Sequence, residues 1–134
     1  IKKACNAVSG LYKFGLDPKF GGIYYFMDVI GKPHMELQWD MKLWWPHNEA
    51  VIAALYAYRL SRKKEFLDMF ENIDEWSWKH FRDRKYGEWY AYLSRNGQPT
   101  HYHKGGKWKT FFHVPRSLLF CIRQMKEIRG NDEK

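Results

Sequence analysis

The sequence predicts an all-α fold in which helices form two layers of a toroid or solenoid and short β-hairpins lie in the loops. Two observations lead to this prediction. A segment that is apolar on nearly every side is followed by one that is apolar on a single side, which is the pattern of an inner and an outer helix. Between the helical segments lie β-branched and aromatic stretches bounded by turn residues, which are typical of hairpins.

The first two elements are a helix and a hairpin. Residues 1–13 have the composition of a helix, and the turn-rich stretch GLDPKFGG follows them. Residues 23–26 are β-branched and aromatic, and apolar residues alternate with polar ones over 35–39. With the Gly31-Lys32 turn between them, these two stretches are expected to form a hairpin.

Two helices of different character come next. Residues 44–60 are apolar on nearly all faces, and Pro46 is acceptable in the first turn. We therefore expect this helix to be buried all round. Residues 64–82 carry one apolar stripe opposite a charged face, which predicts a helix with one wet side.

The last elements are a second hairpin and a final helix. Residues 88–93 are strand-like, an Asn-Gly turn follows, and residues 100–103 can return as the partner strand. Residues 115–128 show a helical stripe of four apolar residues: Leu118, Leu119, Ile122 and Met125. The polar end, residues 130–134, is expected to be a disordered tail.

Length and composition indicate one packed domain. The chain has 134 residues, of which 45% are apolar and 19% aromatic, and this is ample material for a single core. The 7 Trp, 9 Tyr and 9 Phe exceed what a core of this size needs. Aromatic walls are one means by which proteins bind sugar rings.

The charge does not indicate a nucleic-acid or membrane protein. A net charge of +8 comes from 23 Lys and Arg against 15 Asp and Glu. These basic residues are scattered, and the densest group, 59–64, lies at a predicted helix junction. A solvated basic surface is therefore favoured, and neither nucleic acid nor membrane is expected as a partner.

The cysteines and the N-terminal residues give an expectation about the cellular compartment of the protein. Cys5 and Cys121 lie among helical apolar residues and outside any metal-ligand spacing, which predicts reduced, buried thiols. There is no apolar run of the roughly 18 residues that a membrane span needs, and no signal-peptide core. We therefore expect a cytoplasmic protein. The chain has no initiator Met and begins inside a predicted helix, which indicates an upstream part.

His113 is the first candidate for chemistry. It stands at a loop-to-helix junction directly before Val-Pro-Arg, where an imidazole can project into a cavity and exchange a proton near neutral pH. From position alone, a histidine that hydrogen-bonds within the core is the favoured alternative. Arg116, about one turn further, could bind an anionic oxygen, orient a carboxylate or form a structural ion pair.

A second group of candidates lies in the segment KLWWPHNE. Within eight residues it offers a cation, two indoles, an imidazole and a carboxylate at one helix mouth: Lys42, Trp44, Trp45, His47 and Glu49. The alternative, that the tryptophans are core residues and Glu49 complements the helix N-terminus, stays open.

Two other motifs carry weaker signals. His101 and His103 share a face of a predicted strand, but no third ligand follows at a metal spacing, so no metal site is expected. The stretch Lys104–Lys107 lacks the register of a phosphate-binding loop.

Four motifs resemble the N-acylglucosamine 2-epimerase family, which is also known through its renin-binding mammalian members. In chain order they are GGIYYFMD, WDMKLWWPHNEA, FRDRKYGEWYAYLSRNG and KGGKWKTFFHVPR. The resemblance implies an (α/α)6 toroid of roughly 400 residues, of which residues 1–134 would be the C-terminal third.

The resemblance also implies a reaction. Family members remove the C2 proton of an open-chain N-acyl-hexosamine and return it on the opposite face, which interconverts N-acetylglucosamine and N-acetylmannosamine. Two histidines transfer the proton; His113 matches the C-terminal one, and the other would lie upstream. Trp44, Glu49 and Arg116 match pocket positions. His47 matches a position that is histidine in the sugar-amide epimerases and differs in related epimerases.

We thus expect His113 to be catalytic. Five residues are expected to bind substrate: Lys42, Trp44, His47, Glu49 and Arg116. The chemistry requires no cofactor, although some family members bind ATP as an effector. A homodimer or association with an upstream portion is expected, and a noncatalytic sugar-binding or protein-interaction module of the same fold remains the alternative.

Overall fold

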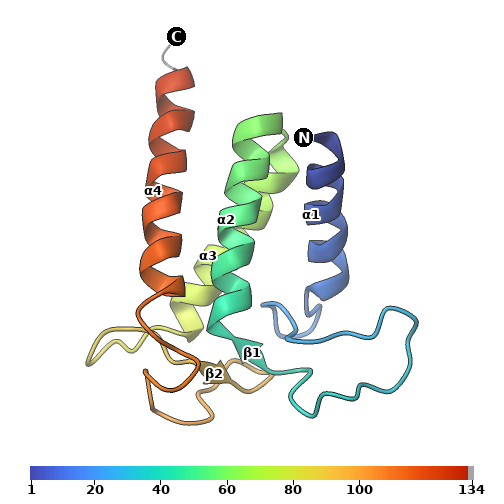
Figure 1. Ribbon diagram of the computed structural model, residues 1–134, viewed down its shortest axis with the longest axis vertical. Coiled ribbons are helices and arrows are strands. Elements are labelled where there is room, and N and C mark those ends of the chain that lie inside the picture. The colour runs from blue at the N-terminus through green and yellow to red at the C-terminus, as the bar shows by residue number, and fades with distance from the viewer. Residues whose placement is uncertain (133–134) are drawn as a thin grey trace.

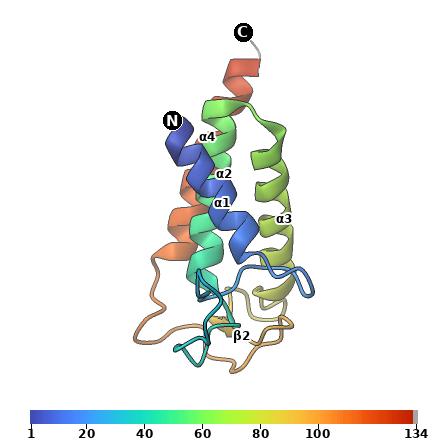
Figure 2. The ribbon, with the colours of Figure 1, turned by 90° about the vertical axis from the view of Figure 1, so that its right-hand side faces the viewer.

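The computed structural model describes residues 1–132, with elements in the order α1 (Lys2–Gly15), β1 (Lys42–Leu43), α2 (Trp44–Ser61), α3 (Lys64–His80), β2 (Tyr92–Leu93) and α4 (His113–Asp132). All four predicted helices are present, which confirms the all-α prediction. Figure 1 shows α1, α2 and α4 standing side by side, with α3 behind α2 and the long loops gathered at one end. Figure 2, turned by 90°, shows α3 on the side away from α4.

The helix α2 lies at the centre and contacts each of the other three. Its residues Val51, Ala54 and Leu55 are buried in a core that α3 completes with the predicted apolar stripe. The expectation that α2 is buried on every side is only partly met, because Trp45 and Leu60 are 37% and 47% exposed. Cys5 and Cys121 are buried in the same core and unpaired, as predicted.

The helix α4 differs from the prediction in the face that it buries. Towards α2 it presents Ser117, Cys121 and Gln124, all buried. Small side chains at the first two of these positions let the two helices approach closely, and the Ser117 hydroxyl donates to the Asn48 carbonyl oxygen. The predicted apolar stripe is instead between 41% and 51% exposed: Leu118, Leu119, Ile122 and Met125. An apolar face of α4 is therefore left uncovered.

The first predicted hairpin is not formed as a ladder. Backbone amides of Tyr25 and Phe26 do donate to the carbonyl oxygens of Met41 and Trp39, but residues 28–40 form turns and a loop. In this loop the Asp28 carboxylate and His34 ring satisfy amides that a strand would pair. Residues 35–39 therefore do not alternate on a sheet face.

The second predicted hairpin reduces to a tight turn with a single bridge between Leu93 and Pro99. Hydrogen bonds from the amides of Ser94 and Thr100 to the carbonyl oxygens of Gln98 and Tyr92 flank this bridge, and residues 101–103 form no strand. The strand residues pair elsewhere: β2 lies antiparallel to β1, with Lys42 opposite Leu93 and Leu43 opposite Tyr92. Local sequence predicted two hairpins, whereas the structure has one two-stranded sheet between distant loops.

The turns after α1 and α3 share one design. In the segments 17–21 (DPKFG) and 83–87 (DRKYG), the Asp side chain accepts two backbone amides and the Asp carbonyl oxygen accepts the amide of the final glycine. These glycines, Gly21 and Gly87, have φ of 70° and 75°, which favours glycine. The chain thus repeats a helix, an Asp-centred turn and a second helix.

The end of the chain departs in part from the expected tail. Residues 130–132 belong to α4, whereas residues 133 and 134 of the predicted tail lie outside the described residues. Within residues 1–132 no helix combines the length and the apolar character that crossing a bilayer requires.

Candidate active site

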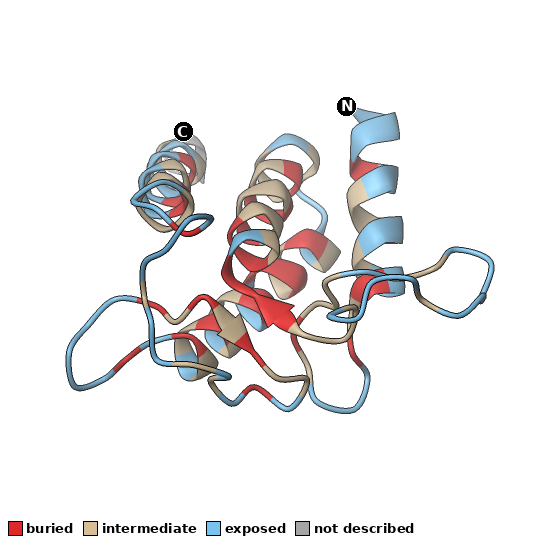
Figure 3. Cartoon of the chain, turned by 60° about the horizontal axis from the view of Figure 1, so that its bottom comes forward, coloured by how far each residue is buried: buried red, intermediate tan, exposed pale blue. Residues whose placement is uncertain are grey.

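A cavity of about 480 Å³ opens at the loop end of the molecule, where β1, β2 and the first residues of α2 and α4 meet. Figure 3 brings this end forward and shows buried residues gathered around the small sheet. The lining is mostly aromatic: Tyr25, Gln38, Leu43, Trp44, Trp45, Tyr92, Trp108 and His113. Its volume falls within the range of pockets that hold small ligands.

The first residue of α4 brings an imidazole to the cavity. His113 Nδ1 lies 2.9 Å from Glu49 Oε1, which projects from the second turn of α2. Arg116, one turn along α4, donates to the same carboxylate oxygen. Three residues predicted from the sequence, 64 to 67 positions apart in the two helices, therefore form one hydrogen-bonded group.

The charge state of Glu49 follows from these contacts. Burial by itself would raise the pKa of Glu49, but the hydrogen bonds from Arg116 and His113 outweigh it and hold the pKa below its usual value. Glu49 is therefore an ionised acceptor, so His113 donates through Nδ1–H. That tautomer leaves Nε2 of a neutral His113 unprotonated.

Both tryptophans at the start of α2 border the imidazole. The ring centroids of Trp44 and Trp45 each lie 6.2 Å from that of His113, Trp44 with its edge and Trp45 tilted by 38°. Trp44 is 2% exposed and Trp45 37% exposed. Trp44 is therefore a fixed wall, and Trp45 a more open one.

Lys42 does not reach the cavity. Its side chain has no exposed surface, its Nζ donates to Asp17 Oδ2 at 3.1 Å, and it lies 4.1 Å from the centre of the Tyr24 ring. Because strand residues alternate between faces, Leu43 lines the cavity while Lys42 points to the other side. The expectation that Lys42 binds substrate directly is therefore not supported by its position.

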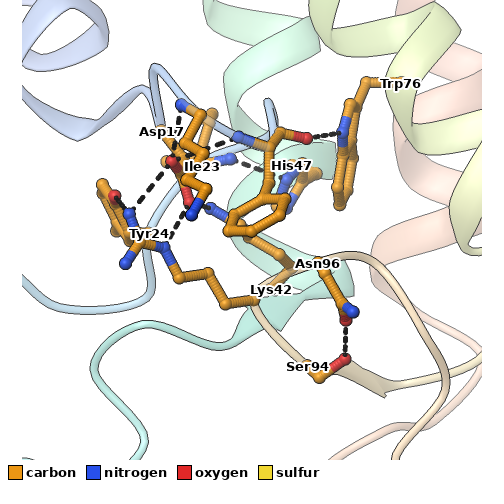
Figure 4. Close-up of polar contacts among 11 residues, drawn as sticks. Asp17, Ile23, Tyr24, Lys42, His47, Trp76, Ser94 and Asn96 are labelled. Atoms are coloured by element: carbon orange, nitrogen blue, oxygen red, sulfur yellow. Dashed lines mark hydrogen bonds and ion pairs between the residues drawn. The ribbon is translucent and has the colours of Figure 1, made fainter.

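His47 is also occupied within the protein. Its Nε2 accepts the backbone amide of Ile23 at 2.9 Å, and its Nδ1 lies 2.7 Å from the carbonyl oxygen of Leu43. The ring has no exposed surface and stacks on Trp76 (Figure 4). Burial lowers its pKa to about 3. His47 is thus a neutral residue that joins the Ile23 loop to the start of α2, and its position does not support the expected role in substrate binding.

Sequence reasoning did not single out five of the lining residues as site residues: Tyr25, Gln38, Leu43, Tyr92 and Trp108. Four of them lie within motifs that carried the family resemblance, so this signal was present: Tyr25, Leu43, Tyr92 and Trp108. No local pattern brings Tyr92 beside Leu43, because their pairing depends on the sheet between two loops.

A larger, apolar groove of about 690 Å³ runs between α1 and α2. Leu11 and Phe14 of α1 are 70% and 42% exposed along it. Glu49 and Trp45 belong to its lining as well. The groove therefore adjoins the cavity but holds no histidine of its own among the described residues.

Known proteins similar to this chain are sugar epimerases and isomerases. The model of the family described as N-acylglucosamine 2-epimerase (GlcNAc 2-epimerase) matches residues 1–117. The mouse N-acylglucosamine 2-epimerase is 46% identical over 107 residues, which are 80% of this chain and 26% of the relative. The human protein of that name is 47% identical over 107 residues, which are 80% of this chain and 25% of the human protein. The chain spans about a quarter of the length of these relatives.

Two solved structures share the fold. A crystal structure of D-mannose isomerase superposes with a TM-score of 0.75 at 25% identity, over 84% of this chain and 28% of the other. The structure of a cellobiose 2-epimerase from Bacillus thermoamylovorans B4167 superposes with a TM-score of 0.75 at 25% identity, over 90% of this chain and 29% of the other. Both are epimerases or isomerases of the toroid fold, so the four helices are a segment of that fold, as predicted.

Proposed function

Because the chain belongs to the N-acylglucosamine 2-epimerase family, we propose that its aromatic cavity holds an open-chain N-acyl-hexosamine and that His113 transfers the C2 proton. The observation that carries the proposal is the group His113–Glu49–Arg116 at the edge of this cavity. The relatives are named for N-acylglucosamine, and inversion at C2 gives the manno form, so the proposed substrates are N-acetylglucosamine and N-acetylmannosamine.

The tautomer of His113 suits a general base. Nδ1–H is held by the ionised Glu49, so Nε2 can accept a proton. The C2–H bond breaks and the proton passes to Nε2, while the electron pair forms the C1–C2 double bond and the C1 carbonyl π pair moves onto O1, which gives an enolate. Glu49 then stabilises the imidazolium by charge, as a carboxylate does beside a catalytic histidine in acyl transfer.

Arg116 serves this arrangement through Glu49. Its guanidinium donates to the carboxylate oxygen that faces His113 and so keeps Glu49 ionised. Without its partners the half-buried Glu49 would have a pKa raised by burial. We therefore propose that Arg116, expected from the sequence to bind substrate, acts as a positioning residue through Glu49.

Epimerisation requires a second group that returns the proton to C2 on the opposite face of the enolate. The family resemblance assigns this role to a histidine upstream of the chain. Consistent with a longer working unit, the chain spans about a quarter of its curated relatives. The proposal for activity therefore concerns the protein that carries this chain.

The two uncovered apolar surfaces support a proposal about partners. One is the stripe of α4, and the other is the groove between α1 and α2. In Figure 1 the helix α4 stands on one side of α2, and α1 stands on the other. We expect further helices of the toroid to pack on both surfaces. Each Å² of apolar surface that they bury would stabilise the assembly by about 25 cal/mol. A second copy of the chain is the competing occupant, and sedimentation at several concentrations distinguishes the two.

The function is tested by C2 proton exchange. The protein that carries this chain is incubated with N-acetylmannosamine in deuterated water, and loss of the C2 proton signal is followed by NMR. Replacing the base, His113→Gln, is expected to lower the exchange rate by roughly 10²–10⁴-fold. Glu49→Gln is expected to lower it by up to about 10⁴-fold, because the imidazolium loses its counter-charge and the tautomer of His113 is no longer fixed.

His103→Gln is the matched control, since this histidine is exposed and does not line the cavity. An active control and an inactive His113→Gln variant support the assignment of the base. Exchange at the wild-type rate in His113→Gln would contradict it. Absence of exchange in the wild type, together with sugar binding by calorimetry, would favour the alternative of a sugar-binding module.

The same assay separates substrates. Free mannose and cellobiose are the competing sugars, because similar structures are those of a mannose isomerase and a cellobiose epimerase. A higher kcat/KM for N-acetylmannosamine than for either sugar is expected, and the reverse order would overturn the proposed substrate class.

A further inference from the structure

A buried ion-pair network lies on the other side of β1 from the cavity. Asp17, the first residue of the Asp-centred turn after α1, is 1% exposed. Its carboxylate accepts from Lys42 Nζ at 3.1 Å and from Arg95 Nε at 2.8 Å. Arg95 Nη2 also donates to the Tyr24 hydroxyl at 2.6 Å. Figure 4 shows Asp17, Tyr24 and Lys42 meeting here.

The network joins three segments that are distant in sequence. Asp17 and Tyr24 belong to the loop after α1, Lys42 to β1, and Arg95 to the turn after β2. Burial alone would raise the pKa of Asp17, but the hydrogen bonds from Arg95, the Lys19 amide and Lys42 hold it far below its usual value. Asp17 is therefore a buried anion between two cations.

Each of these segments also supplies a residue that lines the cavity, and this residue lies one to three positions from the network residue in the chain. Tyr25 follows Tyr24, and Leu43 follows Lys42. Tyr92 lies three positions before Arg95 and opposite Leu43 in the sheet. Because neighbouring residues in extended chain point to opposite sides, a contact made by the network fixes the position of its neighbour in the wall.

The network cannot act by contact with a ligand of the cavity. Neither Asp17 nor Lys42 nor Arg95 lines it. Buried ion pairs are also weak contributors to stability, because desolvation offsets their attraction. In some proteins such a network instead selects one arrangement of the segments that it joins.

We propose that the Asp17–Lys42–Arg95 network is a positioning device that fixes Tyr25, Leu43 and Tyr92 as walls of the sugar cavity. The identity of the ligand as a sugar rests on the proposed function. The positioning of the walls does not, since it follows from the contacts.

The second Asp-centred turn holds another wall in the same manner. Asp83 accepts from Lys104 Nζ at 2.8 Å, and the same ammonium donates to the Gly87 carbonyl oxygen. Lys109 Nζ donates to Glu88 and to the Lys104 carbonyl oxygen. Trp108, which lines the cavity, lies between these two anchored lysines in the chain. An Asp-centred turn with a lysine from a later loop thus anchors each side of the cavity.

Arg95 offers the clearest test, because its side chain is 35% exposed and its replacement leaves the Asp17–Lys42 pair in place. In Arg95→Met, hydrogen–deuterium exchange of the 41–45 and 91–93 backbone is expected to accelerate by about tenfold or more, while α3 is unchanged. The KM for N-acetylmannosamine is expected to rise by about tenfold with kcat within about threefold, because the His113–Glu49 pair is untouched.

Arg95→Lys keeps a cation near Asp17, so its backbone exchange and its KM are expected to return most of the way to the wild-type values. Lys42→Met is the second variant, and it should accelerate the same segments. Lys64→Met is the matched control, because it removes a surface ion pair with Asp68 on α3.

Two outcomes overturn the proposal. Backbone exchange in Arg95→Met and Lys42→Met equal to that in Lys64→Met would show that the network does not hold the walls. Recovery of neither effect in Arg95→Lys would show that the charge contact is not what positions them. If the wild type neither binds sugar nor exchanges the C2 proton, the proposed function fails, and the exchange of the backbone still decides the positioning role.

Discussion

The buried His47 makes the stability of the protein depend on pH in a defined direction. In the folded protein its ring has no exposed surface, and both nitrogens are used by the backbone of Ile23 and Leu43. Protonation would place an unsolvated charge there, which is why burial lowers the pKa to about 3 from an ordinary value of 6.5. In the unfolded chain the imidazole titrates freely.

The difference between the folded and unfolded pKa of His47 sets the sign and the size of the change in stability with pH. Because the folded pKa is the lower one, His47 contributes stability that is present above pH 6.5 and is lost as pH falls towards 3. Between pH 7.5 and pH 5 the unfolded chain takes up a proton that the folded chain refuses, which costs about 2 kcal/mol. A folded pKa one unit higher would change this figure very little, since pH 5 still lies above it.

Urea unfolding followed by tryptophan fluorescence measures the effect. The variant His47→Gln cannot titrate, while its amide can still donate to one backbone group and accept from the other. The wild type is expected to lose about 2 kcal/mol more than the variant between the two pH values. His80, whose pKa burial also lowers, is present in both proteins and cancels. A difference below about 0.5 kcal/mol would refute the argument.

Three further changes have expected results. Phe66→Ala in the core, where Phe66 is 1% exposed, should cost about 3–5 kcal/mol in urea unfolding, and a loss under about 1 kcal/mol would contradict the packing. Gly97→Ala should cost more than about 1 kcal/mol, because Gly97 has φ of +81° and an added Cβ would lie 2.3 Å from His80 Nδ1. Gly31→Ala, also at positive φ but with open space around it, should cost less; equal losses would exclude the clash. Burial raises the pKa of Cys121 to about 11, so labelling by a thiol reagent at pH 8 should be about 100-fold slower than in urea, and equal rates would contradict its burial.

Helix positions were within reach of sequence reasoning because helices are local. The period of apolar residues and the proline in the first turn predicted 44–60, and α2 spans Trp44–Ser61. The stripe on the next segment predicted both α3 and the face that it buries. The apolar stripe of α4 was wrong as a guide to its buried face, because periodicity shows where apolar residues lie and not what covers them.

The site was predicted only in part, for a related reason. His113, Glu49 and Arg116 were named from the sequence, and the structure brings them together. Their candidacy came from motifs, since spacing alone favoured a structural histidine at position 113. Lys42 and His47 came from the same motif and are both buried within other contacts.

The sequence by itself determined the helices, the core of α2 and α3, and the three residues of the hydrogen-bonded group. The tertiary structure alone decided which side of β1 faces the cavity, and hence that Leu43 is a wall and Lys42 an anchor. A lysine lies inside a protein only where an anion meets it, and the anion here is Asp17, 25 residues earlier in the chain. Such a pairing depends on how the loops pack in the folded chain, so a local sequence pattern does not predict it.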